Sequence, residues 1–222
     1  MPSNTCNIAQ NISLLAIKYA EIPAIIYREG SKYKECSFSE FNQLSNDYAH
    51  GFAEEGIKKG TRVIVLVPHS LNFYLIMFAL FKLGAVPVVI DPGMFKLDML
   101  ICIKMAEAEA IIGVAMVHFL KSFFKKTFKS CKISIIVGRK WLWRGVPLSK
   151  IKSKNPNSQN ILRDTVETDL AAILFTSGST GIPKGVEYEH GMFYHQVIAI
   201  QKLYDLKPGQ KDLPCFPLFG LF

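Results

Sequence analysis

The sequence lacks the features of secreted proteins and of proteins stabilised by disulfides or a structural metal ion. Its five cysteines, at positions 6, 36, 102, 131 and 215, include no Cys-x-x-Cys pair, which disfavours a disulfide framework or a structural zinc site. No basic residue precedes Lys18, and the early apolar stretch from Ile12 to Ile17 contains Ser13, so the N-terminus does not resemble a signal peptide. Reduced cysteines without an export signal predict a cytosolic protein.

The sequence also lacks an apolar run long enough to cross a bilayer. The longest stretch without charge, Val63 to Phe81, is interrupted near its middle by Pro68, and only Leu71 to Phe81 is continuously apolar enough for lipid. This remainder is too short for a hydrocarbon layer of about 30 Å, so the stretch predicts a strand, a turn and a buried helix. With 50% hydrophobic and 20% charged residues, the chain is also not a disordered or fibrous protein.

Acidic residues are absent between Ala110 and Arg163, where 12 lysines and arginines supply the whole positive excess of the chain. The part from Met116 to Lys129 alternates aromatic residues with lysines at helical spacing. One interpretation is an amphipathic helix whose basic face contacts anionic lipid, a phosphorylated ligand or an acidic partner. The plainer one is a solvated helix face that packs on the core through Phe119, Leu120, Phe123, Phe124 and Phe128. No motif for binding nucleic acid accompanies the charge.

The order of predicted elements is that of an α/β protein. A capping box of Ser37 and Glu40 predicts a helix that runs to Gly56. Unbroken apolar runs between helix-length segments predict a mostly parallel sheet with helices on both faces, because strands buried on both sides need no polar alternation. The expected strands are Val63–Val67, Val86–Ile90, Ala110–Val114 and Ile133–Val137.

The polar, turn-rich segment Lys152–Asn160 predicts a linker. It divides the chain into a first α/β subdomain, residues 1–151, and the beginning of a second subdomain, residues 161–222. The second subdomain opens with a predicted strand, Leu170–Phe175.

A loop rich in glycine and hydroxyl groups joins this strand to another, Val186–Tyr188. Glycines expose backbone N–H groups, hydroxyls add donors and Lys184 adds a positive charge, which together can hold a polyphosphate. The spacing matches neither the Walker loop nor the dinucleotide fingerprint. A flexible linker is the alternative, but linkers are seldom clamped between two apolar strands. The predicted phosphate-binding residues are Thr176, Ser177, Gly178, Ser179, Thr180, Gly181 and Lys184.

The string from Thr176 to Gly185, with the Glu-His-Gly that follows, resembles the signature loop of the adenylate-forming superfamily. The likeness extends over essentially the whole chain, including the segment Leu83–Pro92. His190–Phe193 and Asp212–Phe222 resemble the fatty-acid acyl-CoA ligase branch, and within it the olefin β-lactone synthetases. Many acyl-CoA ligases carry a histidine where Gly220 stands, so this position departs from the ordinary ligase pattern.

The resemblance implies the N-terminal part of the large α/β domain of such an enzyme, with ATP and Mg²⁺ as cofactors. A carboxylic acid, here a fatty acid, attacks the α-phosphate of ATP, and the acyl adenylate then passes to a thiol such as that of CoA or to an internal hydroxyl. The loop grips the β- and γ-phosphates. We interpret His190 as a structural residue that bonds a backbone group at the start of the next helix; catalysis is the alternative.

Members of this superfamily are longer than this chain. The resemblance places the adenine and ribose contacts, the Mg²⁺ ligand and the catalytic lysine beyond Phe222, so we expect no catalytic residue within the chain and no activity from it alone. Its apolar end, Cys215 to Phe222, predicts association with itself or with chaperones. Three hypotheses follow: part of a ligase, a non-catalytic descendant that binds a nucleotide, an acyl ligand or a protein, and a peripheral membrane protein that uses residues 121–154.

Overall fold

The computed structural model describes residues 5–91, 93–94, 96–138, 144–154, 156–176 and 183–213. The strands are β1 Pro23–Glu29, β2 Lys32–Ser37, β3 Arg62–Leu66, β4 Val86–Ile90, β5 Ala110–Val114, β6 Ile133–Val137, β7 Val146–Pro147, β8 Leu170–Thr176 and β9 Lys184–Glu189. The helices are α1 Gln10–Lys18, α2 Phe38–Glu54, α3 Leu71–Lys82, α4 Lys96–Ala106, α5 Ala115–Phe123, α6 Leu148–Lys154 and α7 His190–Leu203.

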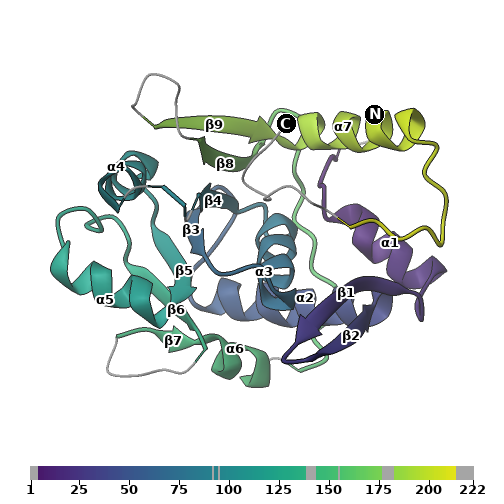
Figure 1. The fold of residues 1–222 in the computed structure, drawn as a ribbon, viewed down its shortest axis with the longest axis horizontal. Helices are drawn as coiled ribbons and strands as arrows, with labels where there is room; N and C mark the ends of the chain where they lie inside the picture. Colours follow the sequence, from purple (N-terminus) through teal and green to yellow (C-terminus); the bar gives the residue numbers. More distant parts are fainter. Residues whose placement is uncertain are drawn as a thin grey trace.

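One large sheet organises the fold. Its strands follow the order β7-β6-β5-β3-β4-β8-β9, and the two strands β1 and β2 form a separate hairpin that contacts α2 (Figure 1). Neighbouring strands of the large sheet are parallel, except that β9 returns antiparallel along β8. The predicted parallel pairing of β3, β4, β5 and β6 is therefore confirmed.

Both faces of this sheet are buried. Side chains alternate across a strand, and in β3 the side chains of Val63 and Val65 join one core cluster while that of Ile64 joins another. The first cluster includes residues of α2 and α3, and the second includes residues of α4 and Val117 of α5. Helices thus cover the sheet on both sides, which explains why its strands read as unbroken apolar runs.

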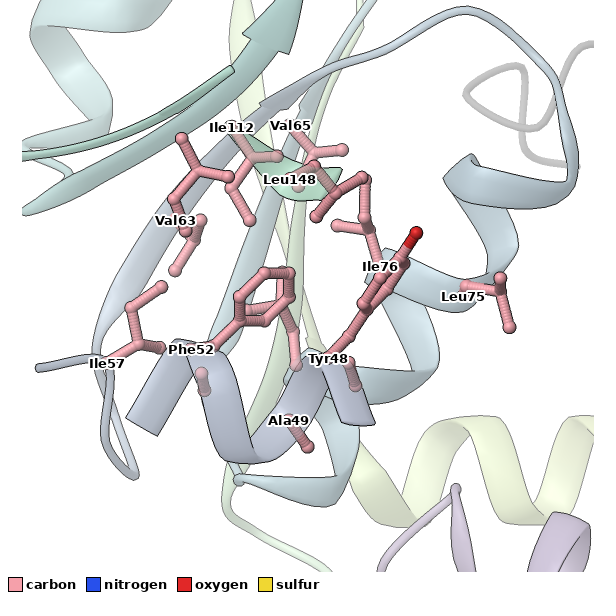
Figure 2. Close-up of a cluster of buried hydrophobic side chains, with 14 of the residues drawn as sticks. Tyr48, Ala49, Phe52, Ile57, Val63, Val65, Leu75, Ile76, Ile112 and Leu148 are labelled. Carbon is pink, nitrogen blue, oxygen red and sulfur yellow. The ribbon is translucent and has the colours of Figure 1, made fainter. Parts of the chain in front are cut away.

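Phe52 lies near the middle of the cluster between α2 and the sheet. Figure 2 shows its ring among Ile57, Val63 and Tyr48, and no part of the side chain is exposed. Tyr48 stacks beside it at 5.9 Å between ring centroids. The helix that carries both begins at the predicted capping box: Ser37 Oγ accepts from the Glu40 backbone N–H, and the Glu40 carboxylate accepts from that of Ser37.

The sheet corrects one expectation. From the sequence we expect the strands that accompany β8 and β9 to come after Phe222, but Val88–Ile90 of β4 pair in parallel with Ile173–Phe175 of β8. A local apolar run predicts a strand but says nothing of its pairing partner. The division into residues 1–151, 152–160 and 161–222 stays a prediction, although α6 extends into the first residues of the predicted linker.

The basic helix also differs from the prediction. It ends at Phe123, because the backbone angles of Phe124 are no longer helical. The predicted helical periodicity therefore does not continue to Lys129. Phe128 and Val117 are buried. The sequence predicts that Phe119, Phe123 and Phe124 pack on the core, but they are 40%, 69% and 42% exposed. Within the described residues, no helix has both the length and the apolarity that a membrane crossing requires.

A fully buried lysine joins α3 to α2. The Lys82 ammonium donates to the Asn42 carbonyl at 3.0 Å, to Asn42 Oδ1 at 2.8 Å and to Asn46 Oδ1 at 2.6 Å. Three oxygen acceptors match the three N–H donors of a charged lysine. Burial lowers the pKa of Lys82 to about 7, while the negative charge of Asp47 opposes this shift.

This lysine makes stability depend on pH. Above about pH 7 the folded protein releases the Lys82 proton, whereas the unfolded chain keeps it to about pH 10.4, so the free energy of unfolding should rise with pH between these values. Urea unfolding of the native protein and of Lys82→Met at several pH values measures the effect. The slope should be smaller in Lys82→Met than in the native protein and should be retained when the exposed Lys58 is replaced by Met; equal slopes in all three proteins would contradict the assignment.

Candidate phosphate-binding site

The β8–β9 hairpin frames the segment that the sequence assigns to phosphate binding. Thr176, the last residue of β8, pairs with Lys184, the first residue of β9. Of the predicted phosphate-binding residues, Ser177, Gly178, Ser179, Thr180 and Gly181 lie outside the described residues. The two described members of the set, Thr176 and Lys184, therefore lie side by side at the end of the hairpin where the two strands are connected.

This end of the hairpin lies at the carboxyl edge of the parallel strands. Ile90, the last residue of β4, pairs with Phe175, so Asp91 and Thr176 leave the sheet next to each other. After β4, the Gly93 N–H donates to Asp91 Oδ1 at 2.7 Å, a local bond typical of a turn. Ligands of open α/β sheets bind at this edge, because the strands end there and the loops converge.

From the glycine-rich loop we expect Lys184 to be exposed on a flexible turn; it is exposed, but it belongs to a strand. Its neighbour Gly185 lies opposite Phe175, and a Cβ atom at Gly185 would approach the Phe175 ring to 3.1 Å. The glycine thus permits close pairing of the two strands beside Lys184. Strand pairing fixes the direction of the lysine's backbone, while exposure leaves its ammonium group available to an anion.

The other end of the hairpin is fixed in the core through His190. The side chain of His190 is fully buried, and its Nδ1 accepts a hydrogen bond from the Ile8 backbone N–H at 3.3 Å. His190 thus bonds a backbone group, as predicted, but that group belongs to the N-terminal segment and not to the start of the next helix. Burial lowers the pKa of His190 to about 4, so the ring is neutral at pH 7, and its Nε2 has no partner among the described residues. This burial favours a structural role.

An apolar cavity of about 330 Å³ opens at the same edge of the sheet. Its walls come from the ends of β3, β4 and β5 and from α5, and they include Leu66, Ile90, Val114 and Met116. Sequence patterns do not identify these residues as a group, because each reads locally as part of a strand or helix. Only the pairing of the strands brings them together.

The described residues show no gathering of three or more His, Cys, Asp or Glu side chains that would hold a metal ion. The arrangement can offer a phosphate group the Thr176 hydroxyl and the Lys184 ammonium as donors, and it can offer an alkyl chain an apolar cavity.

Comparisons with known proteins identify the family to which the chain belongs. Residues 16–220 match the family model described as AMP-binding enzyme. The chain belongs to this family. An olefin beta-lactone synthetase of Xanthomonas campestris pv. campestris is 38% identical over 98% of the chain, which covers 40% of that relative. The family resemblance identified from the sequence is thus confirmed, and the chain spans about two fifths of the relative's length.

Two solved structures of CoA ligases share the fold. A long-chain-fatty-acid-CoA ligase of Archaeoglobus fulgidus superposes with a TM-score of 0.78 at 24% identity, covering 93% of this chain and 41% of that protein. An anthranilate CoA ligase in complex with anthranoyl-AMP superposes with a TM-score of 0.75 at 17% identity, covering 86% of this chain and 36% of that protein. At these identities the likeness establishes the α/β fold.

A glycine next to His190 gives a test of how the hairpin is fixed. A Cβ atom at Gly191 would lie 3.0 Å from Glu167 Cβ and 3.1 Å from the Glu167 carbonyl oxygen, so Glu167 would have to give by a few tenths of an ångström. Gly191→Ala should lower the free energy of unfolding by about 1–3 kcal/mol through this overpacking. Urea denaturation measures the loss. A change below about 0.5 kcal/mol, the size expected of neutral surface sites, would show that this junction is not tightly packed.

Proposed function

We propose that this chain contributes the phosphate-holding part of an ATP-dependent carboxylate ligase. The observation that supports the proposal is the β8–β9 hairpin, which holds Thr176 and Lys184, the two residues that flank the predicted loop, at the carboxyl edge of a parallel sheet. In the proposed reaction, a carboxylate oxygen attacks the α-phosphorus of ATP. A carboxyl–phosphate bond forms, the bond to the β-phosphate oxygen breaks, and pyrophosphate leaves with the electron pair.

The residues of the loop stabilise the leaving pyrophosphate. Backbone N–H groups and hydroxyls donate to phosphate oxygens, and the Lys184 ammonium neutralises the charge that accumulates as the bond breaks. The proposed contacts to the β- and γ-phosphates are Thr176, Ser177, Gly178, Ser179, Thr180, Gly181 and Lys184. Mg²⁺ would supply further charge neutralisation on ATP; we assign it no ligand in this chain.

The acid is proposed to be a fatty acid. The apolar cavity lies at the carboxyl edge of β3, β4 and β5. Because β4 pairs with β8, an alkyl chain in this cavity would be close to the β8–β9 hairpin. The fatty-acid ligase among the structural neighbours and the olefin beta-lactone synthetase among the relatives are consistent with this choice. The adenylate is then proposed to pass to CoA or to an internal hydroxyl.

The role of Lys184 can be measured in a chimera. Residues 1–222 replace the corresponding part of the Xanthomonas olefin beta-lactone synthetase, and carboxylate-dependent ATP–pyrophosphate exchange is followed. The chimera should be active, and Lys184→Ala should slow exchange by about 10²-fold, as expected when one donor to a developing charge is removed. The exposed Lys202, replaced by Ala, is the matched control and should leave the rate unchanged.

The same assay is run on residues 1–222 alone. We expect no exchange, because catalysis needs the acid, the α-phosphate and the metal held together. Exchange by a monomer of the chain alone would contradict the assignment of catalytic residues to other parts of the enzyme. An active chimera whose rate does not depend on Lys184 would contradict the role of the hairpin.

A second proposed property is contact with anionic membranes through residues 121–154. It is supported by α5, where Met116 and Phe123 are 65% and 69% exposed, and by the exposed lysines that follow the helix. Exposed aromatic and basic side chains together bind lipid interfaces.

Vesicle sedimentation tests this contact. Binding to vesicles with about 30% phosphatidylserine, a proportion of the order used to mimic anionic leaflets, should fall with added salt and with the double variant Met116→Ser, Phe123→Ser. The control replaces Tyr33 and Leu203, which are exposed elsewhere, by Ser. Binding that is insensitive to both salt and the α5 variant would contradict the proposal.

A further inference from the structure

A second cavity, of about 960 Å³, lies far from the phosphate hairpin. It is open to solvent and is bounded by α5, by the residues that enter β6 and by the residues that enter β7. Figure 1 places β7 and α5 on the opposite side of the molecule from β8 and β9. Lys132 and Gly145 precede their parallel strands, so this cavity is at the amino edge of the sheet, whereas Thr176 is at the carboxyl edge.

Among the described residues, four cations line this cavity: Lys121, Lys125, Lys132 and Arg144. The one carboxylate among these described lining residues is that of Glu55, at the end of α2. The other lining residues are His118, Ser122, Ser134 and Gly145, together with the apolar Ile133 and Val146. The cavity is therefore strongly positive and has hydroxyl groups on its walls.

Lys121 is held in place and not simply solvated. Its half-buried ammonium donates to the Cys131 carbonyl at 2.6 Å and to Ser134 Oγ at 2.7 Å, which leaves one of its three N–H donors for a ligand. Burial lowers the pKa of Lys121, so an anion that approached it would stabilise the charged form. A lysine fixed by two hydrogen bonds gives the cavity a preorganised donor.

Ion pairs within the described part of the chain do not neutralise these four charges. The pairs observed there involve other lysines, such as Lys59 with Asp169 at 2.7 Å and Lys154 with Glu54 at 3.7 Å. Like charges that gather around an open cavity repel one another, and a bound anion relieves this repulsion.

We propose that this cavity binds the phosphate groups of a polyanionic ligand. A phosphate dianion offers several oxygens to lysine ammonium groups and accepts paired hydrogen bonds from an arginine guanidinium, which matches the groups present. The volume is large enough for more than one phosphate group. The site is independent of the proposed ATP contacts, because it shares no residue with the β8–β9 hairpin.

Calorimetric titration of residues 1–222 with inositol hexakisphosphate tests the proposal. The double variant Lys125→Ala, Arg144→Ala should weaken binding by at least about tenfold, since two charge-assisted contacts are lost. Both side chains are exposed, so the variant should fold normally. The matched control, Lys58→Ala with Lys104→Ala, removes the same charge from exposed sites outside the cavity and should change affinity by less than about twofold.

Two further titrations distinguish binding in this cavity from binding at the hairpin and from a general affinity for anions. Lys184→Ala should retain binding of inositol hexakisphosphate; loss of binding in that variant would place the ligand at the hairpin and overturn the proposal. Citrate tests whether any polyanion suffices, and citrate that binds as tightly as the phosphorylated probe would overturn it too. Equal weakening in the cavity variant and in the matched control would show a response to net charge alone and would count against a built site.

Vesicles distinguish a lipid headgroup from a soluble ligand. Sedimentation with vesicles of phosphatidylcholine containing phosphatidic acid, and with phosphatidylcholine alone, is compared for the native chain and the Lys125→Ala, Arg144→Ala variant. Binding that needs phosphatidic acid, is lost in the variant and is displaced by inositol hexakisphosphate assigns the cavity to a headgroup. Binding of the soluble probe without such sedimentation assigns it to a free phosphorylated ligand, and absence of both refutes the site.

Discussion

The pairing of β4 with β8 is the contact on which the candidate site depends. Its register sets Ile90 beside Phe175, so the loop after β8 leaves the sheet next to the turn at Asp91. Ala172 and Leu174 pack on one face with Phe81 of α3, while Ile173 and Phe175 pack on the other. Since β9 is held in the sheet through β8, the positions of Lys184 and of α7 follow from this one parallel pair.

Buried polar groups fix the elements around that pair. Asn7 donates to the Phe81 carbonyl at 2.8 Å and to the Arg163 carbonyl at 3.1 Å, which ties the N-terminal segment to α3 and to the chain that enters β8. Thr165 Oγ1 donates to the Cys6 carbonyl at 2.7 Å, and His190 accepts from Ile8. Apolar packing tolerates small shifts, whereas these directional bonds select one arrangement of the segments that meet behind the hairpin.

The sequence predicts the elements of this fold better than their pairing. The runs of β4, β5 and β6 agree with the structure at both ends, because strands buried on both faces need continuous apolar residues. The partner of β8 does not follow from the sequence, since pairing depends on contacts distant along the chain. Composition and spacing reveal the signature loop, but the apolar cavity and the basic cavity are assembled by side chains from several elements. The prediction for Phe119 and Phe123 is wrong because helical spacing does not say which face meets the sheet.

The distance in sequence between β4 and β8 also determines when the site can form. Val88 and its partner Ile173 are separated by 173 − 88 = 85 residues. At a synthesis rate of about 5–20 residues per second, one edge of β4 remains unpaired for roughly 4–17 seconds before β8 has been synthesised. A strand edge left unpaired for this time is a template for wrong contacts. The phosphate hairpin is therefore among the last parts of the sheet to be placed during synthesis, and chaperones have their longest opportunity to act at the strand that carries it.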